Sequence, residues 1–388
     1  MRARILLVSL ALVACRRERE PSGRSWPTPP VEQADGGVVA SRLPRIAYRG
    51  GPFLRNPRIV TVTWKSDDPA LVARLERFGE TITRTAWWRT VVDAYCTRPD
   101  DCIGEGRRGA PARLDGTLPP EVSDADVEAI LQRAIDAGRI AAPADALVVA
   151  YLPPGVSFHD ANVPRYCAGG PRARHGRLRA VKTKPAFAIV PRCSDESELT
   201  AAASHEILEA TTNPDPAARG FALDQGTASL GFAMAGVEPV DPCGLVTRDR
   251  HRTTEGGFTL QRAWSNRAAA LGANPCVPAP AGAPYFVLVP REPAVRLAKE
   301  GDRATLVVEA ASDRPIAPWT ASVVDVTGER EGERVVDLAI DRPTVAAGET
   351  ATVTITLRRV HPKHVSLVGV VSTSGGESHL WPVPIVMR

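Results

Sequence analysis

The cysteines limit most strongly what this chain can fold into. There are seven: Cys15 ends a short N-terminal apolar segment, and the other six lie between residues 96 and 276. An even number of cysteines behind an export signal predicts disulfides, because compartments outside the cytoplasm are oxidising. Their spacings match no zinc–thiolate pattern. Sequential pairing would make each bridge close a local loop, and we expect the bridges Cys96–Cys102, Cys167–Cys193 and Cys243–Cys276.

The N-terminal segment predicts export and a lipid anchor. In residues 1–15, Arg2 and Arg4 precede an apolar run that is too short to span a bilayer, as in a secretory signal peptide. The run ends in Leu-Val-Ala-Cys15, which resembles the lipobox of bacterial lipoproteins, and plain cleavage nearby is the alternative. We expect an exported protein of the bacterial cell envelope, at the outer membrane or cell surface, that contacts the membrane through this lipid only. Residues 16–43 are polar and Pro-rich and predict a disordered tether.

Length and charge narrow the classes of protein further. A chain of 388 residues is long enough for two domains. Its net charge is only +4, and no predicted element gathers its basic residues into a stripe. Nucleic acid is therefore not an expected partner.

Residues 44–280 have the pattern of a mixed α/β domain. β-branched or apolar runs predict strands over 58–64, 146–152 and 187–190. Helical spacing of apolar residues predicts helices over 69–95 and 123–137, with a long surface loop over 104–122 between them.

The sequence pattern of residues 283–388 differs from that of the preceding domain and predicts an all-β immunoglobulin-like sandwich. Six short strands are expected, over 285–289, 304–309, 322–326, 350–357, 365–371 and 382–386, with turn residues between them. This part contains no cysteine and no cluster of histidines and carboxylates.

We interpret the histidines of the whole chain that have no evident partner as surface residues: His159, His251, His361, His364 and His379.

The helix predicted after Cys193 carries the motif with the clearest chemistry. Residues 201–216 read AAASHEILEATTNPDP, in which His205-Glu206-x-x-Glu209 differs by one residue type from the H-E-x-x-H signature of zinc peptidases. Asp195 with Glu198 fits a capping box at the start, and Asn213-Pro214 ends the helix. A helical-wheel projection places His205 and Glu209 on one face of the helix. This face points away from a core stripe formed by Leu199, Ala203, Ile207 and Ala210.

These residue types suit a catalytic zinc ion. Zinc binds imidazole nitrogen and carboxylate oxygen, and a catalytic site keeps three protein ligands and an open position for water. His205 and Glu209 would supply two ligands and Glu206 the general base. Glu238 or Asp241, in the acidic segment before Cys243, is expected as the third ligand, with Asp215, Asp224 and His175 as weaker alternatives. The competing interpretation is a charged, solvated helix face.

Several stretches resemble, in order, the phosphate-induced, EXORDIUM-like family and its bacterial exported relatives, which carry a His-Glu-x-x-Glu metalloprotease-type helix. Residues 48–60 (YRGGPFLRNPRIV) are similar to that family's opening. The later landmarks are Tyr166-Cys167, Val190-Pro191-Arg192-Cys193, Ser204-His205-Glu206, Glu209-Ala210, Thr212-Asn213-Pro214, Asp241-Pro242-Cys243, Leu260-Gln261-Arg262-Ala263-Trp264-Ser265-Asn266 and Cys276. The resemblance covers about residues 46–278.

The resemblance implies a metal site at His205, Glu206, Glu209, Glu238 and Asp241. Two stretches depart from the bacterial pattern: Ala168-Gly169-Gly170 stands where Gly-Tyr-His is expected, and Glu238-Pro239-Val240-Asp241 where Glu-Ile-Gly-Asp is expected. We therefore expect a zincin-like domain that binds one zinc ion and hydrolyses peptide bonds of a peptide or protein substrate. The alternative is a non-catalytic surface protein that binds wall polymer or a protein partner.

Overall fold

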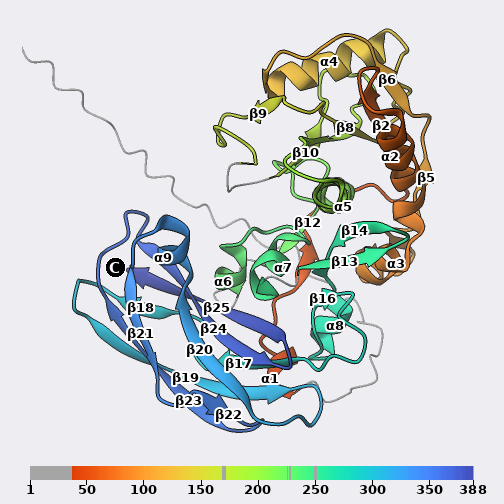
Figure 1. Cartoon of the computed structure of the whole chain (residues 1–388). Helices are drawn as coiled ribbons and strands as arrows, with labels where there is room; N and C mark the ends of the chain where they lie inside the picture. Colours follow the sequence, from red (N-terminus) through yellow and green to blue (C-terminus); the bar gives the residue numbers. More distant parts are fainter. Residues whose placement is uncertain (1–36, 168–171, 225, 227–228, 249–250, 388) are drawn as a thin grey trace, which may run out of the picture. The chain divides into compact units, whose positions relative to one another are not determined.

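The computed structural model describes residues 37–387, except 168–171, 225, 227–228 and 249–250. The signal peptide, Cys15 and most of the expected tether lie outside the described residues. Helix α1 (Gly37–Ala40) begins the described chain (Figure 1). No described helix is long and apolar enough to cross a membrane.

A mixed sheet organises the N-terminal part of the chain. Its strand order is β10-β11-β8-β2-β5, and β6 also pairs with β2. All neighbours are parallel except β10, which lies at one edge and runs antiparallel to β11. The bounds are β2 (Arg58–Trp64), β5 (Arg107–Arg108), β6 (Ala112–Leu114), β8 (Ala146–Tyr151), β10 (Arg174–Arg177) and β11 (Ala186–Val190). The three strands expected from sequence are the three central ones.

Helices cover both faces of this sheet, which is why its central strands are apolar on both sides. Helix α4 (Asp124–Asp136) packs on one face, where Val127 and Leu131 meet Val148. Helices α2 (Pro69–Thr81) and α5 (Glu196–Thr212) pack on the other, where Phe78 and Ile207 share a core with Val149 (Figure 1). The expected mixed α/β character is confirmed.

The prediction of a single helix over residues 69–95 was wrong. The chain instead forms α2, a 3-10 turn (Ile82–Arg84) and α3 (Ala86–Val92). Thr85 separates them: it is extended, and its hydroxyl accepts the N–H of Trp88 at 3.1 Å as the N-cap of α3. The apolar spacing continues through the break because Trp87 and Trp88 are both buried.

Shorter elements complete the N-terminal part. They are β1 (Ile46–Tyr48), β3 (Cys96–Arg98), β4 (Asp101–Cys102), β7 (Glu121–Ser123), β9 (Ser157–His159), β12 (Phe221–Leu223), α6 (Leu230–Ala233), α7 (Asp241–Val246), β13 (Arg252–Glu255), β14 (Phe258–Gln261), β15 (Ala263–Trp264), α8 (Asn266–Ala270) and β16 (Cys276–Val277). The expected loop over 104–122 therefore contains short strands. The three disulfides join Cys96 to Cys102, Cys167 to Cys193 and Cys243 to Cys276, which is the pairing expected from sequence.

The C-terminal part consists mainly of two antiparallel-rich sheets, as in a β-sandwich. One has the order β17-β19-β23-β21 and the other β18-β25-β24-β20-β22. The bounds are β17 (Phe286–Pro290), β18 (Val295–Leu297), β19 (Arg303–Ser312), β20 (Trp319–Asp325), α9 (Val326–Glu331), β21 (Val336–Ile340), β22 (Thr344–Val345), β23 (Thr350–Leu357), β24 (Val365–Ser374) and β25 (Glu377–Met387). All six expected strands are present, whereas β18, β21, β22 and α9 were not expected.

Two histidines of this part are not at the surface, contrary to the expectation from sequence. His361 and His379 are buried. His361 contacts Glu331 through Nε2 at 2.8 Å, and the ring of His379 packs against Tyr285 and Phe286. The partners lie far away in sequence, so the sequence alone does not reveal them.

Candidate metal centre

Helix α5 holds the central residues of the site and is much more buried than expected. Asp195 is its N-cap and accepts the N–H of Glu198 at 2.9 Å, whereas the side chain of Glu198 pairs with Arg172 and Arg252 instead of closing a capping box. Fourteen of its 17 residues are buried, Glu206 and Glu209 among them. The competing interpretation, a charged and solvated helix face, is therefore wrong, because other segments cover this face.

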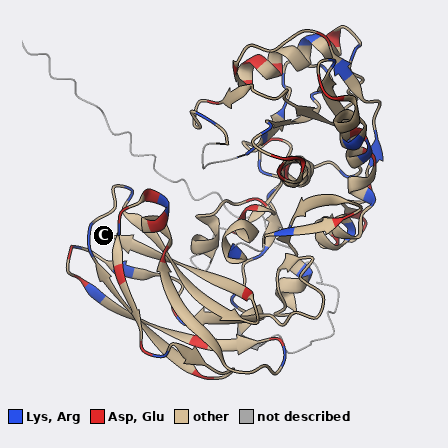
Figure 2. Ribbon diagram, viewed as in Figure 1, with Lys and Arg blue, Asp and Glu red and all other residues tan. Residues whose placement is uncertain are grey.

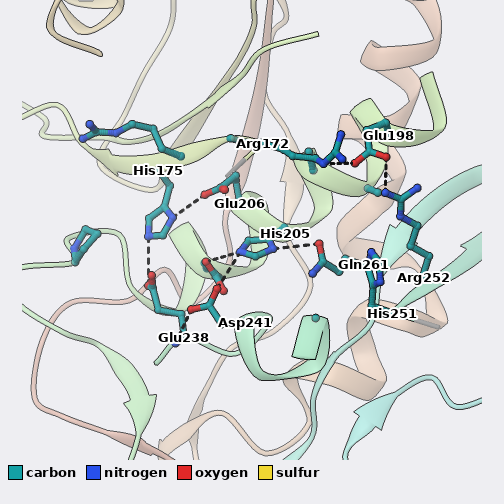
Figure 3. A pocket seen from close by; sticks show the side chains of 17 residues that line it. Arg172, His175, Glu198, His205, Glu206, Glu238, Asp241, His251, Arg252 and Gln261 are labelled. Carbon is teal, nitrogen blue, oxygen red and sulfur yellow. Dashed lines mark hydrogen bonds and ion pairs between the residues drawn. The ribbon is translucent and has the colours of Figure 1, made fainter. Parts of the chain in front are cut away.

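His205, Glu209 and Asp241 converge on one point. His205 Nε2 lies 2.9 Å from Glu209 Oε2 and 3.7 Å from Asp241 Oδ1. The other ring nitrogen, Nδ1, lies 3.1 Å from Oε1 of Gln261 at the end of β14. That contact orients the ring and directs Nε2 toward the two carboxylates (Figure 3).

A second group lies beside the first. His175, on the edge strand β10, places Nδ1 2.8 Å from Glu206 Oε2 and Nε2 3.3 Å from Glu238 Oε1. His175 is buried, and its Nε2 has no aligned hydrogen bond. One ligand atom each from His175, Glu206 and Glu209 lie within 4.8 Å of one another, and the same holds for His205, Glu209 and Asp241.

The acidic segment 238–241, which ends at the first residue of α7, is held in place by hydrogen bonds. The N–H of Val240 donates to Glu209 Oε1 at 3.2 Å, and the N–H of Glu238 donates to Asp241 Oδ2 at 3.3 Å. Asn213, at the C-terminal end of α5, donates from Nδ2 to Glu238 Oε1 at 2.7 Å. These contacts tie the segment to α5, and the Cys243–Cys276 disulfide anchors its following turn.

Gly236 leaves the space that the Asp241 carboxylate occupies. A Cβ atom at this position would lie 1.9 Å from Asp241 Oδ2, and the backbone φ angle is +144°. Only glycine both leaves room for the carboxylate and readily adopts this φ angle.

The site opens into a pocket of about 770 Å³. Its lining includes both histidine–carboxylate groups and, nearer Glu198, the side chains of Arg172 and Arg252 (Figure 3). Elsewhere, Lys and Arg are distributed over many elements of the described ribbon (Figure 2). Among the described residues, the ion pairs of Glu206, Glu209, Glu238 and Asp241 are made with histidine.

Burial and crowding of like charges perturb the acid–base properties of the first group. Burial, followed by the neighbouring Asp241 charge, raises the pKa of Glu209 to about 8. Burial also raises the pKa of Asp241 to about 6, although His205 opposes the shift. Burial alone would lower the pKa of His205, but Glu209 and the other carboxylates outweigh it and raise this pKa well above its usual value.

In the second group, the carboxylates raise the pKa of the histidine, and the histidine lowers the pKa of one carboxylate. Burial favours neutral His175, yet Glu238 and Glu206 outweigh it and raise the pKa of His175 well above its usual value. Burial would raise the pKa of Glu238, but His175 lowers it on balance. In both groups the carboxylates therefore favour the charged form of the histidine.

The structure brings together His205, Glu206, Glu209, Glu238 and Asp241, the residues singled out from sequence. His175, a weaker alternative, belongs to the same cluster. Asp215 and Asp224 do not, because they pair with Arg179 and Arg49 instead. Sequence reasoning missed the supporting role of Asn213, Gly236 and Gln261, and His251 lines the pocket although it was expected at the surface.

Comparisons with known proteins add no functional information. No family model and no curated protein matches this chain. Solved structures with weak similarity include the titin M3 domain (12% identity, 27% of this chain and 96% of that chain, TM-score 0.17). Others are the E. coli chaperone DraB (9% identity, 27% and 54%, TM-score 0.20) and a Bacteroides ovatus GH5 xyloglucanase with a bound heptasaccharide (10% identity, 27% and 19%, TM-score 0.18). TM-scores this low indicate neither fold nor function.

Proposed function

We propose that this protein is an exported, zinc-dependent hydrolase of peptide bonds. His205, Glu209 and Asp241 are the zinc ligands and Glu206 is the general base. The observation that carries the proposal is the convergence of one imidazole and two carboxylates at the wall of an open pocket, with a further carboxylate on the adjacent residue of the same helix.

The donor atoms fit zinc in kind and spacing. Ligands about 2.1 Å from a tetrahedral ion stand about 3.4 Å from one another. The separations of 2.9 Å and 3.7 Å from His205 Nε2 to its two carboxylate neighbours bracket that value. Asp241 is preferred to Glu238 as third ligand, because Glu238 contacts His175 instead.

The surrounding side chains suit a hydrolytic step. A divalent cation at this position would polarise a substrate carbonyl and acidify a bound water. Glu206 would accept the proton from the attacking water and return it to the leaving amine. His175 would hold the Glu206 carboxylate in place, since its Nδ1 is 2.8 Å from Oε2, and Gln261 would fix the ring of His205.

The fold supports the same proposal in its general form. A zincin-like domain would combine a mostly parallel sheet, an antiparallel edge strand and a ligand-bearing helix, and β10 and α5 fit those positions. We propose further that the C-terminal sheets form an immunoglobulin-like sandwich that binds an envelope component. Three disulfides are compatible with export. The lipid anchor at Cys15 predicts incorporation of a radioactive fatty acid that disappears in Cys15→Ser.

Metal analysis combined with a peptidase assay tests the function. The full chain, treated with chelator and reloaded with zinc, should bind a tight zinc ion and cleave casein. His205→Ala should lose that zinc. Glu206→Gln should retain it and lose about 10²–10⁴-fold in rate, the usual contribution of a general base. His159→Ala, on β9 and outside the pocket lining, is the matched control and should behave as wild type.

The outcomes separate the enzyme from the binding protein. Zinc bound tightly by wild type without cleavage of casein or of a peptide library would favour a non-catalytic surface protein. No tight zinc in wild type, or tight zinc kept by His205→Ala, would refute the metal centre.

A further inference from the structure

We infer that the pocket contains a second, weaker cation position formed by His175, Glu206 and Glu209, and that a cation bound there inhibits the hydrolase. The inhibition rests on the proposed function, because it follows from capture of the general base. The binding of a second ion does not require catalysis.

The second position has its own imidazole and its own carboxylate. His175 stands on β10 and Glu206 on α5, and their closest atoms are 2.8 Å apart. Glu238 adds a carboxylate oxygen 3.3 Å from His175 Nε2. Whichever ring nitrogen binds an ion, the other keeps a carboxylate neighbour, which is how metal-binding histidines are usually oriented.

His175 is a buried histidine with a carboxylate beside each ring nitrogen. Its side chain is only 5% exposed, and Nε2 lies 3.3 Å from Glu238 Oε1 without an aligned hydrogen bond to any described residue. A buried imidazole nitrogen without a hydrogen bond is costly. A cation bound between His175 and Glu206 would neutralise the adjacent carboxylates, and Glu238 would orient the other ring nitrogen.

The charge balance of the pocket also favours more than one cation. Four carboxylates face two imidazoles, and the nearby guanidinium groups are engaged elsewhere. Arg172 and Arg252 both pair with Glu198, and Arg174 pairs with Asp124. A single divalent ion leaves two of the four carboxylate charges uncompensated when both imidazoles are uncharged, and one when His175 is protonated.

Glu209 belongs to both groups and would bridge the two ions. Paired metal ions in proteins commonly stand about 3.5–4 Å apart and share ligands. Glu209 Oε2 faces His205 Nε2 at 2.9 Å, and a Glu209 oxygen also lies within 4.8 Å of the ligand atoms of His175 and Glu206. In the first position Glu209 and Asp241 both face the same ring nitrogen of His205, whereas Glu206 and Glu238 face opposite ring nitrogens of His175. The first position should therefore fill first.

Filling the second position would remove the base. A Glu206 carboxylate that coordinates a cation cannot at the same time accept a proton from water. Turnover should therefore rise with the first equivalent of zinc and fall as the second binds.

Zinc binding to the metal-free full chain tests the inference directly, with equilibrium dialysis and elemental analysis as the readout. We expect two zinc ions per chain for wild type and for the His159→Ala control. His175→Ala and, separately, Glu206→Gln should each retain one, the tight ion. Glu206→Gln keeps the shape of the side chain, so it remains informative if His175→Ala does not fold.

Three outcomes would overturn the inference: one zinc per chain in wild type at saturation, a second zinc that survives in both variants, or zinc inhibition that is unchanged in His175→Ala. At a zinc concentration that halves the wild-type rate, the rate of His175→Ala should not fall below its own rate with only the tight zinc ion bound. Two zinc ions without any peptidase activity would refute the proposed function but not the second site. One zinc ion with activity would refute only the second site.

Discussion

Gly236→Ala gives the sharpest structural test of the metal centre, because it moves one ligand without removing it. The new Cβ would lie 1.9 Å from Asp241 Oδ2, whereas ordinary contacts begin near 3.4 Å. The carboxylate must therefore shift by about 1.5 Å, well beyond the tolerance of about 0.2 Å for a metal–ligand distance. We expect tight zinc binding to weaken about 10–100-fold, the range usual when a residue that positions a ligand is changed.

The assay is competition for zinc against a chelator of known affinity, at constant pH and ionic strength. Gly236→Ala also forces alanine into a positive φ, which costs about 1–3 kcal/mol. Gly116→Ala is the matched control: its φ is +88° and nothing lies within 4 Å of the new Cβ, so it carries the backbone cost without moving a ligand. If Gly236→Ala binds zinc as tightly as Gly116→Ala does, Asp241 is not a ligand.

Two further predictions concern stability. Burial, with Arg262 nearby, lowers the pKa of His379 from 6.5 to about 4, so the unfolded chain binds a proton that the folded chain does not. The contribution of His379 to the free energy of unfolding should therefore fall by about 3 kcal/mol as the pH decreases from 6.5 to 4. Urea titrations should show a smaller loss in His379→Phe than in wild type, and an equal loss would contradict the assignment. Replacing Cys243 and Cys276 together by alanine opens a bridge with a sequence separation of 33, which should cost about 3–4 kcal/mol. It should also weaken zinc binding, because the disulfide anchors the turn after Asp241; unchanged affinity in the folded double variant would show that the backbone contacts to α5 suffice.

The sequence by itself determined the elements whose signal is local. The β-branched run at 58–64 became β2 with those bounds, and Asp195 and Asn213 mark the ends of α5. The disulfide pairing also followed from local loop closure. In these cases the physical cause lies within a few residues, where periodicity, caps and loop lengths act.

Only the tertiary structure decided the burial and the partners of the site. The wheel placed His205 and Glu209 away from the core stripe, but β14, the acidic segment and β10 cover that face of α5 and remove Glu209 from solvent. His175 joins Glu206 because β10 pairs antiparallel with β11 at the edge of the sheet, a register that no local pattern encodes. The residues that could bind a cation could therefore be named from the sequence, whereas their division into two groups that share Glu209 is a property of the folded chain.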